Sequence, residues 1–321
     1  MRSPKLDPAA RAVLEIMDAQ GRPPLEQLSP AESRANREGM MALAGDAVPV
    51  ARVEDIEIAG EGGPLKLRIY SPELAGGPHP CLLFFHGGGF VICDLDSHDT
   101  ICRALAAGSG AVVIAVDYRL APEHKFPAAV DDCETATRWA AANAARLRID
   151  PLLIAVGGDS AGGDLATVVA RRLRDTDGPP LALQVLIYPV TDVRISDTPS
   201  MREFSEDNFL TRSAMQWFMA HYLNKPEEGL HPDASPLLAP DVNGLPPALV
   251  ITAECDPLCS EGEAYADRLK EAGVPVTYTC YPGMIHAFVS MRAVFPQAQQ
   301  AIAQVAGALR EMRPALSASH A

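Results

Sequence analysis

A serine stands in the middle of a glycine-rich run of the sequence. Ser160 lies in GGDSAGG (157–163), directly after the short apolar segment 152–156. The pattern Gly-x-Ser-x-Gly is typical of a sharp turn from strand to helix that exposes the serine, and its glycines avoid collisions in that turn. A serine hydroxyl is a weak nucleophile, so it also needs a base and donors for an oxyanion. The run predicts that Ser160 is a catalytic nucleophile.

A second glycine run, HGGGF (86–90), follows the apolar segment 81–85. Three consecutive glycines let a loop bring backbone N–H groups close to a substrate. We expect an oxyanion hole made by the N–H groups of Gly88 and Gly89 and by that of Ala161, which follows the serine. Alone, the run would indicate only a flexible turn. The serine elsewhere in the chain favours the functional interpretation.

An aspartate and a histidine follow two later apolar segments. Asp256 ends the segment 248–253, and His286 follows the segment 276–281. The order Ser, Asp, His predicts that His286 takes the proton of the serine and that Asp256 orients the imidazole. Singly, an aspartate before proline is often a turn former and a histidine among apolar residues is often structural. Glu254 is the second candidate for the carboxylate, because it lies nearer the strand.

The elements that must position these residues alternate along the chain. Two alternating segments, 53–58 and 65–70, predict antiparallel strands, and later short apolar runs are typical of strands buried on both faces. These runs cover 81–85, 111–116, 152–156, 183–188, 248–252 and 276–281, and the expected helices between them cover 98–108, 127–145, 160–175, 260–273 and 296–312. The alternation predicts an α/β fold with a mostly parallel, eight-stranded sheet flanked by helices.

Two segments fall outside this alternation. Residues 1–45 predict helices with Asp7 and Ser29 as N-caps, and residues 191–239 contain a helical segment, 211–223, but no strand. We assign both to a helical cap over the carboxyl edge of the sheet, where α/β sheets bind ligands. We expect four parts along the chain: 1–45 is the N-terminal part of the cap, 46–190 the first part of the core, 191–239 the inserted cap segment and 240–321 the second part of the core.

Composition limits the classes of function. The 321 residues are 48% hydrophobic and carry a formal net charge of -14, which disfavours nucleic acid and anionic membranes as partners. No apolar stretch reaches the roughly 18 residues of a membrane span and the N-terminus lacks the pattern of a signal peptide, so we expect a cytoplasmic protein.

No cofactor or metal is expected. Asp164 follows Gly163 where a phosphate-binding loop needs Lys-Ser/Thr, and neither Gly-x-Gly-x-x-Gly nor His-Glu-x-x-His occurs. The seven cysteines are odd in number and lack Cys-x-x-Cys spacing, so they are expected to be reduced thiols and no zinc site is predicted. Cys255 and Cys259 flank Asp256, and we hypothesise that thiol reagents inhibit by disturbing this loop.

Together these residues resemble the bacterial carboxylesterases similar to hormone-sensitive lipase, a family IV branch of the α/β-hydrolase superfamily. The resemblance rests on HGGGF (86–90), DYRLAPEHKFPAA (117–129), GDSAGG (158–163), DPL (256–258) and HAF (286–288). It implies an α/β-hydrolase fold, Ser160, Asp256 and His286 as the triad, and Gly88, Gly89 and Ala161 as the oxyanion hole. It also implies a mobile helical cap, a homodimer, and a serine carboxylesterase that hydrolyses short- to medium-chain acyl esters through an acyl-enzyme, without a cofactor.

Some details and alternatives remain open. Ser260 replaces the second carboxylate of the family pattern and is expected to cap the following helix. Asp117 and Arg119 are expected to form a buried pair. Candidate pocket residues, for which core packing is at least as good an explanation, are Phe90, Tyr188, Phe209, Trp217 and Met284. The alternatives are a non-catalytic protein that binds a small ligand on the same fold, and an amidase with the same triad.

Overall fold

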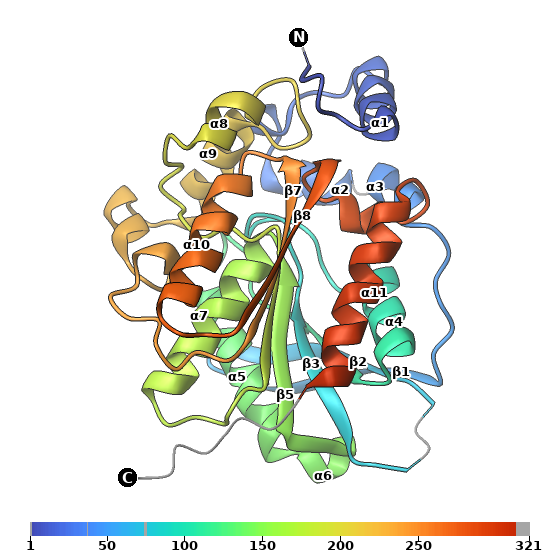
Figure 1. The fold of residues 1–321 in the computed structure, drawn as a ribbon, viewed down its shortest axis with the longest axis vertical. Helices are drawn as coiled ribbons and strands as arrows, with labels where there is room; N and C mark the ends of the chain where they lie inside the picture. Colours follow the sequence, from blue (N-terminus) through green and yellow to red (C-terminus); the bar gives the residue numbers. More distant parts are fainter. Residues whose placement is uncertain (1, 37, 74–75, 313–321) are drawn as a thin grey trace.

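The computed structural model describes residues 2–36, 38–73 and 76–312, and a twisted eight-stranded sheet runs through their centre (Figure 1). In spatial order the strands are β1 (Arg52–Gly60), β2 (Gly63–Ser71), β4 (Val112–Asp117), β3 (His79–Phe85), β5 (Ile149–Asp159), β6 (Leu183–Ile187), β7 (Ala248–Cys255) and β8 (Val276–Ile285). The pairs β1–β2 and β2–β4 are antiparallel, and all later pairs are parallel. The predicted sheet is therefore confirmed.

The α-helices are α1 (Pro8–Ala19), α2 (Pro30–Ala35), α3 (Glu38–Ala44), α4 (Asp99–Ser109), α5 (Ala128–Ala142), α6 (Ala144–Leu147), α7 (Ala161–Asp175), α8 (Pro199–Phe204), α9 (Arg212–Tyr222), α10 (Cys259–Glu271) and α11 (Pro296–Glu311). Short 3-10 helices are η1 (Leu25–Gln27), η2 (Pro226–Leu230), η3 (Pro236–Leu238) and η4 (Phe288–Ser290). In Figure 1, α4 and α11 lie on one face of the sheet and α5, α7 and α10 on the other. The sheet is thus the middle of three layers.

Burial explains why the central strands read as continuous apolar runs. Every residue of β6 is buried, as are five consecutive residues of β3 and of β4, because helices cover both faces. Two apolar clusters fill the spaces between the layers, one against α5, α7 and α10 and the other against α4, α11 and α1. The outermost strand β1 has one buried residue, Ile58, in agreement with its alternating sequence.

The N-terminal segment and the segment 191–239 contact each other at the end of the sheet where the arrowheads of β7 and β8 lie (Figure 1). The indole Nε1–H of Trp217 in α9 donates to the Leu28 carbonyl at 3.2 Å. Lys5 forms an ion pair with Glu203 of α8 at 2.9 Å. The predicted N-caps are present as well. The Asp7 carboxylate accepts a hydrogen bond from the Ala9 N–H at 2.8 Å, and Ser29 forms a capping box with Glu32.

Two details of the sequence interpretation were wrong. Arg119 pairs with Asp132 of α5 at 2.8 Å instead of with Asp117, because the chain turns after β4 and directs the guanidinium toward that helix. Ser260 does not cap α10, because the helix already begins at Cys259. The Ser260 hydroxyl instead accepts a hydrogen bond from the backbone N–H of Ser200 at 3.1 Å. That contact joins α10 to α8.

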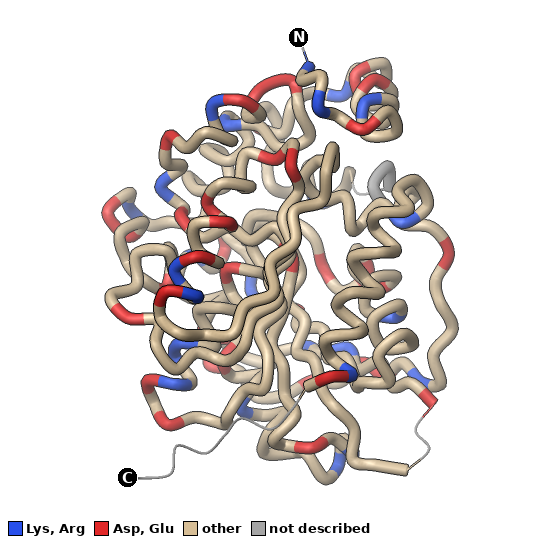
Figure 2. Tube along the Cα trace, viewed as in Figure 1, with Lys and Arg blue, Asp and Glu red and all other residues tan. Residues whose placement is uncertain are grey.

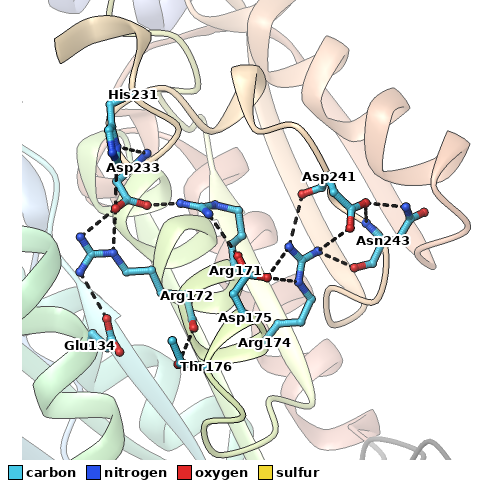
Figure 3. A network of polar contacts seen from close by, with 10 residues as sticks. All are labelled: Glu134, Arg171, Arg172, Arg174, Asp175, Thr176, His231, Asp233, Asp241 and Asn243. Carbon is cyan, nitrogen blue, oxygen red and sulfur yellow. Dashed lines mark hydrogen bonds and ion pairs between the residues drawn. The ribbon is translucent and has the colours of Figure 1, made fainter.

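Charged residues are interspersed over the surface. Figure 2 shows Lys and Arg scattered among Asp and Glu on many helices and loops, instead of collecting on one element. Many pair locally, as in the network of α7 shown in Figure 3. Within residues 2–36, 38–73 and 76–312, we find no helix with the length and apolar character needed to cross a bilayer.

Candidate active site

The turn between β5 and α7 holds Ser160 in a strained conformation. Its φ of 55° and ψ of −117° lie outside the regions that L-residues ordinarily adopt. A Cβ at Gly158 would collide with the carbonyl oxygen of Phe85 and with Gly162, and a Cβ at Gly162 would collide with the same oxygen. Both positions therefore require glycine, as the sequence pattern indicated.

Ser160, His286 and Asp256 form a continuous hydrogen-bonded chain. The Ser160 Oγ lies 2.9 Å from His286 Nε2, and His286 Nδ1 lies 2.6 Å from Asp256 Oδ2. All three side chains are buried, Asp256 completely. Since the carboxylate can only accept, Nδ1 carries the proton and Nε2 is free to accept from the serine hydroxyl. The arrangement can remove a proton from Ser160 and stabilise the imidazolium that results.

The ends of two strands position the histidine and its carboxylate. Asp256 directly follows β7 and His286 directly follows β8. Both therefore lie at the edge of the sheet where β5 ends and Ser160 follows it. The Asp256 Oδ1 accepts from the Leu258 N–H at 2.9 Å, which holds the carboxylate toward the imidazole. Glu254, the alternative carboxylate, accepts from the Gly283 N–H at 2.8 Å and forms no described bond with His286. The geometry thus favours Asp256 over Glu254 as the carboxylate that orients His286.

Side chains from other elements hold the glycine loop after β3 in place. Gly88 and Gly89 have φ of 102° and 59°, which suit glycine. The Gly87 N–H donates to Asp159 Oδ1 at 3.0 Å, and the same oxygen lies 3.0 Å from His98 Nε2. Within the part of the chain that the structure describes, no group accepts a hydrogen bond from the N–H of Gly88 or of Gly89. These N–H groups can therefore donate to a substrate oxygen.

Buried groups beneath this loop have shifted pKa values. Burial, together with the nearby His98, lowers the pKa of His86 to about 3, so its ring is neutral at pH 7 and stacks on Tyr118 at 4.2 Å. Burial acts to raise the pKa of Asp159, but the interactions with His98 and the Gly87 N–H outweigh it and lower the pKa. His86 and Asp159 therefore support the loop as a neutral ring and an anion.

Arg34 in α2 was missed by the sequence interpretation, and it connects the N-terminal segment to the glycine loop. Its Nε donates to the Val91 carbonyl at 2.8 Å, and Nη2 donates to the Ala121 carbonyl at 2.8 Å. Both terminal nitrogens bind Glu123 at 2.8 Å, and this hydrogen-bonded pair lowers the pKa of Glu123 to about 2. No local pattern around Arg34 predicts these distant partners.

The predicted pocket residues occupy different environments. Phe90 is fully buried and stacks on Tyr222 of α9 with 3.9 Å between ring centres, and Met284 is also fully buried. The Tyr188 ring lies 4.8 Å from the His286 ring. Phe209 and Trp217 are partly exposed, and both belong to the segment 191–239. Among the described residues, no group of three or more His, Cys, Asp or Glu side chains is placed to hold a metal ion.

Fold and site together define a serine hydrolase of the α/β class, and comparison with known proteins agrees. A family model for the alpha/beta hydrolase fold matches residues 82–290. The chain belongs to the α/β-hydrolase family and, within it, to the carboxylesterases of the hormone-sensitive-lipase type. The predicted serine carboxylesterase is confirmed at this level.

Three relatives illustrate the match. A carboxylesterase of Mycobacterium tuberculosis is 40% identical over 269 residues, which cover 83% of this chain and 84% of that protein. An ethyl acetate hydrolase of Pseudomonas putida is 40% identical over 321 residues and covers 95% of this chain and 99% of its own. The solved structure of a hyperthermophilic esterase from Pyrobaculum calidifontis is 43% identical with a TM-score of 0.91, and the match covers 97% of this chain and 98% of that one.

Proposed function

We propose that this carboxylesterase hydrolyses short- to medium-chain acyl esters with Ser160, His286 and Asp256 as its catalytic triad. The unbroken chain of 2.9 Å and 2.6 Å contacts from hydroxyl to imidazole to carboxylate carries the proposal. The name of the Pseudomonas putida relative, an ethyl acetate hydrolase, supports small esters as substrates.

The reaction begins when His286 Nε2 takes the proton of Ser160 and the serine oxygen attacks the ester carbonyl. Negative charge develops on the carbonyl oxygen, where the N–H groups of Gly88, Gly89 and Ala161 donate hydrogen bonds. Ala161 is the first residue of α7, so its N–H has no acceptor within the helix. The imidazolium then protonates the departing alkoxide, which leaves an acyl-enzyme.

Water completes the cycle on the acyl-enzyme. His286 removes a proton from the water, the hydroxide attacks the acyl carbonyl, and the same oxyanion donors stabilise the second tetrahedral intermediate. Asp256 stays ionised and holds the imidazole through its short bond to Nδ1. The free acid leaves when Ser160 recovers its proton.

We assign the walls of the substrate pocket to the cap formed by 1–45 and 191–239. Phe209 and Trp217 are partly exposed aromatic side chains of the cap, and Tyr188 lies against the catalytic imidazole. The bonds of Trp217 to Leu28 and of Lys5 to Glu203 support a single cap made of both segments. Phe90 and Met284, which are fully buried, support the site from behind by packing. A homodimer and a cytoplasmic location remain predictions from the sequence.

The test is hydrolysis of p-nitrophenyl esters from acetate to palmitate by the wild type, Ser160→Ala and His286→Gln. Turnover falls with long chains, and each variant loses about 10⁴-fold or more in kcat. His124→Gln is the matched control, because His124 is exposed, and it keeps wild-type kcat. The corresponding p-nitroanilides distinguish an amidase. Substantial turnover by Ser160→Ala, or anilides cleaved faster than esters, would contradict the proposal.

A further inference from the structure

Two cysteine thiols meet beside the loop that carries Asp256. Cys259 is the first residue of α10, Cys280 lies in β8, and their Sγ atoms are 3.9 Å apart. Both are partly exposed, whereas the cysteines described as buried are Cys81, Cys102, Cys133 and Cys255. The other partly exposed cysteine is Cys93. Among the described residues, Cys259 and Cys280 are thus two partly exposed cysteines whose thiols contact each other.

The pair also has the electrostatics of a reactive dithiol. The hydrogen bond between the two thiols lowers the pKa of Cys280 and raises that of Cys259, so Cys280 is the thiol of the pair that ionises more readily. A thiolate is the form that attacks oxidants and disulfides, and a nearby second thiol can resolve the product. The sequence alone could not reveal the pair, because its members are 21 residues apart in different elements.

We propose that Cys259 and Cys280 are a site of reversible disulfide formation that lowers the esterase activity by displacing Asp256. The activity part rests on the triad proposed above. The oxidant is a hydroperoxide, ROOH. The Cys280 thiolate attacks its terminal oxygen, the O–O bond breaks, and ROH leaves with one proton from solvent, giving a sulfenic acid. The Cys259 sulfur then attacks the sulfenic sulfur and releases water. Two thiols and ROOH thus yield one disulfide, ROH and water.

Bond formation must bring the two sulfurs closer together. A disulfide needs about 2.05 Å between its sulfurs, so the 3.9 Å gap has to close by about 1.9 Å. Cys280 pairs with Thr252 in the β7–β8 ladder and is held by the sheet. Cys259 stands at a helix start without a side-chain cap, so this end moves more easily.

Movement of Cys259 reaches the carboxylate directly. The Cys259 N–H donates to the Asp256 carbonyl at 3.0 Å, and the preceding N–H, of Leu258, donates to Asp256 Oδ1 at 2.9 Å. The other oxygen of that carboxylate holds His286 at 2.6 Å. Because a misplacement of about 1 Å in a catalytic group can cost about 100-fold in rate, the disulfide is expected to lower kcat while KM changes little.

The covalent step is tested on the purified protein with hydrogen peroxide, and with diamide as a second oxidant. Free thiols are alkylated, and the protein is digested with trypsin and with a protease that cleaves before aspartate, which separates Cys255 from Cys259. Mass spectrometry of the unreduced digest is expected to show the peptides of Cys259 and Cys280 joined, with two hydrogen atoms missing. Dithiothreitol separates them. This readout does not depend on esterase activity.

The functional step uses the same samples in the p-nitrophenyl ester assay. Oxidation lowers kcat by about 10-fold or more, and dithiothreitol restores it. Cys280→Ser and Cys259→Ser each abolish the linked peptide and the loss on oxidation. Cys93→Ser, which removes the other partly exposed thiol, keeps both responses.

Three results would overturn the proposal. They are oxidation of the two thiols without the linked peptide, a linked peptide with unchanged kcat, and a loss of kcat that persists in Cys280→Ser. An inactive wild type that still forms the linked peptide would instead place the failure in the proposed function.

Discussion

Asp256 and Glu254 are two residues apart, yet only Asp256 binds the imidazole of His286 in the described structure. An amide at position 256 can no longer act only as an acceptor, so it allows the wrong tautomer of the histidine. We predict that Asp256→Asn lowers kcat about 10³- to 10⁴-fold, measured with p-nitrophenyl butyrate. Glu254→Gln is the matched control and changes kcat less than about 10-fold, because Glu254 binds Gly283. Equal losses in the two variants would refute this assignment.

At the residue scale, the sequence could identify the chain Ser160–His286–Asp256 because each member follows a strand that ends at one edge of the sheet. Such an inference needs only strand order. It failed for Arg119, whose partner Asp132 belongs to the next helix, since the direction of a long side chain depends on tertiary packing. For the same reason, the contacts of Arg34 with distant carbonyl groups could not be predicted from the sequence.

At the element scale, α2 and the glycine loop are joined by Arg34. This guanidinium binds the carbonyl of Val91, which directly follows the loop, and the carbonyl of Ala121. Arg34→Ala frees the loop that carries the proposed oxyanion donors, so we predict a fall of about 10-fold in kcat/KM, mainly in kcat. Steady-state kinetics measure it. Arg52→Ala, which removes an exposed pair with Glu54, is the control and leaves kcat/KM unchanged. The prediction fails if both variants match the wild type.

Helix α7 anchors the far end of the inserted segment. Arg171 and Arg172 both bind Asp233, as Figure 3 shows. Asp233 is only 7% exposed. Asp233→Asn leaves the two guanidinium groups without their shared carboxylate, and we predict a loss of about 3 kcal/mol in the free energy of unfolding by urea. Asp175→Asn, which alters the more exposed carboxylate of the same network, costs less than about 1 kcal/mol. Similar losses in both would contradict this role.

Elements with a strong periodic pattern were predictable, and short ones were not. The eight strands and the long helices coincide with expected segments to within a few residues, because burial imposes the pattern. The six-residue α8 was missed because it is too short to show a periodic pattern, although Thr198 caps it and Pro199 begins it. Contacts such as that of Ser200 with the Pro257 carbonyl at 2.7 Å also stabilise it. Distant contacts of this kind leave no mark on the local sequence.

For the whole molecule, two buried acids link stability to pH. Glu261 in α10 and Asp164 in α7 are almost completely inaccessible, and burial raises the pKa of Glu261 to about 8 and that of Asp164 well above its usual value. Among the described residues, neither oxygen of Asp164 has a hydrogen-bond partner. Both groups are therefore protonated in the fold at pH values where the unfolded chain has lost those protons.

The sign of the effect follows from this difference in bound protons. Between the ordinary pKa of 4.5 and the folded value of about 8, folded Glu261 holds a proton that the unfolded chain has released, so stability falls as pH rises through this range. The slope is about 1.4 kcal/mol per pH unit for one proton, and Asp164 adds to it in the same direction. Above pH 8 the contribution of Glu261 levels off.

Glu261→Gln replaces this titrating carboxyl group by an amide, which binds no proton in this pH range. The amide oxygen can still accept from the Thr191 N–H, which lies 2.7 Å from the carboxyl group. We predict that its stability relative to the wild type rises by about 1.4 kcal/mol per pH unit from pH 5 to pH 7, measured by urea unfolding. Glu263→Gln alters an exposed carboxylate of the same helix, so its stability relative to the wild type stays constant over this range. If Glu261→Gln also kept a constant difference, Glu261 would be ionised in the fold, and its burial would have to be offset by a charge partner.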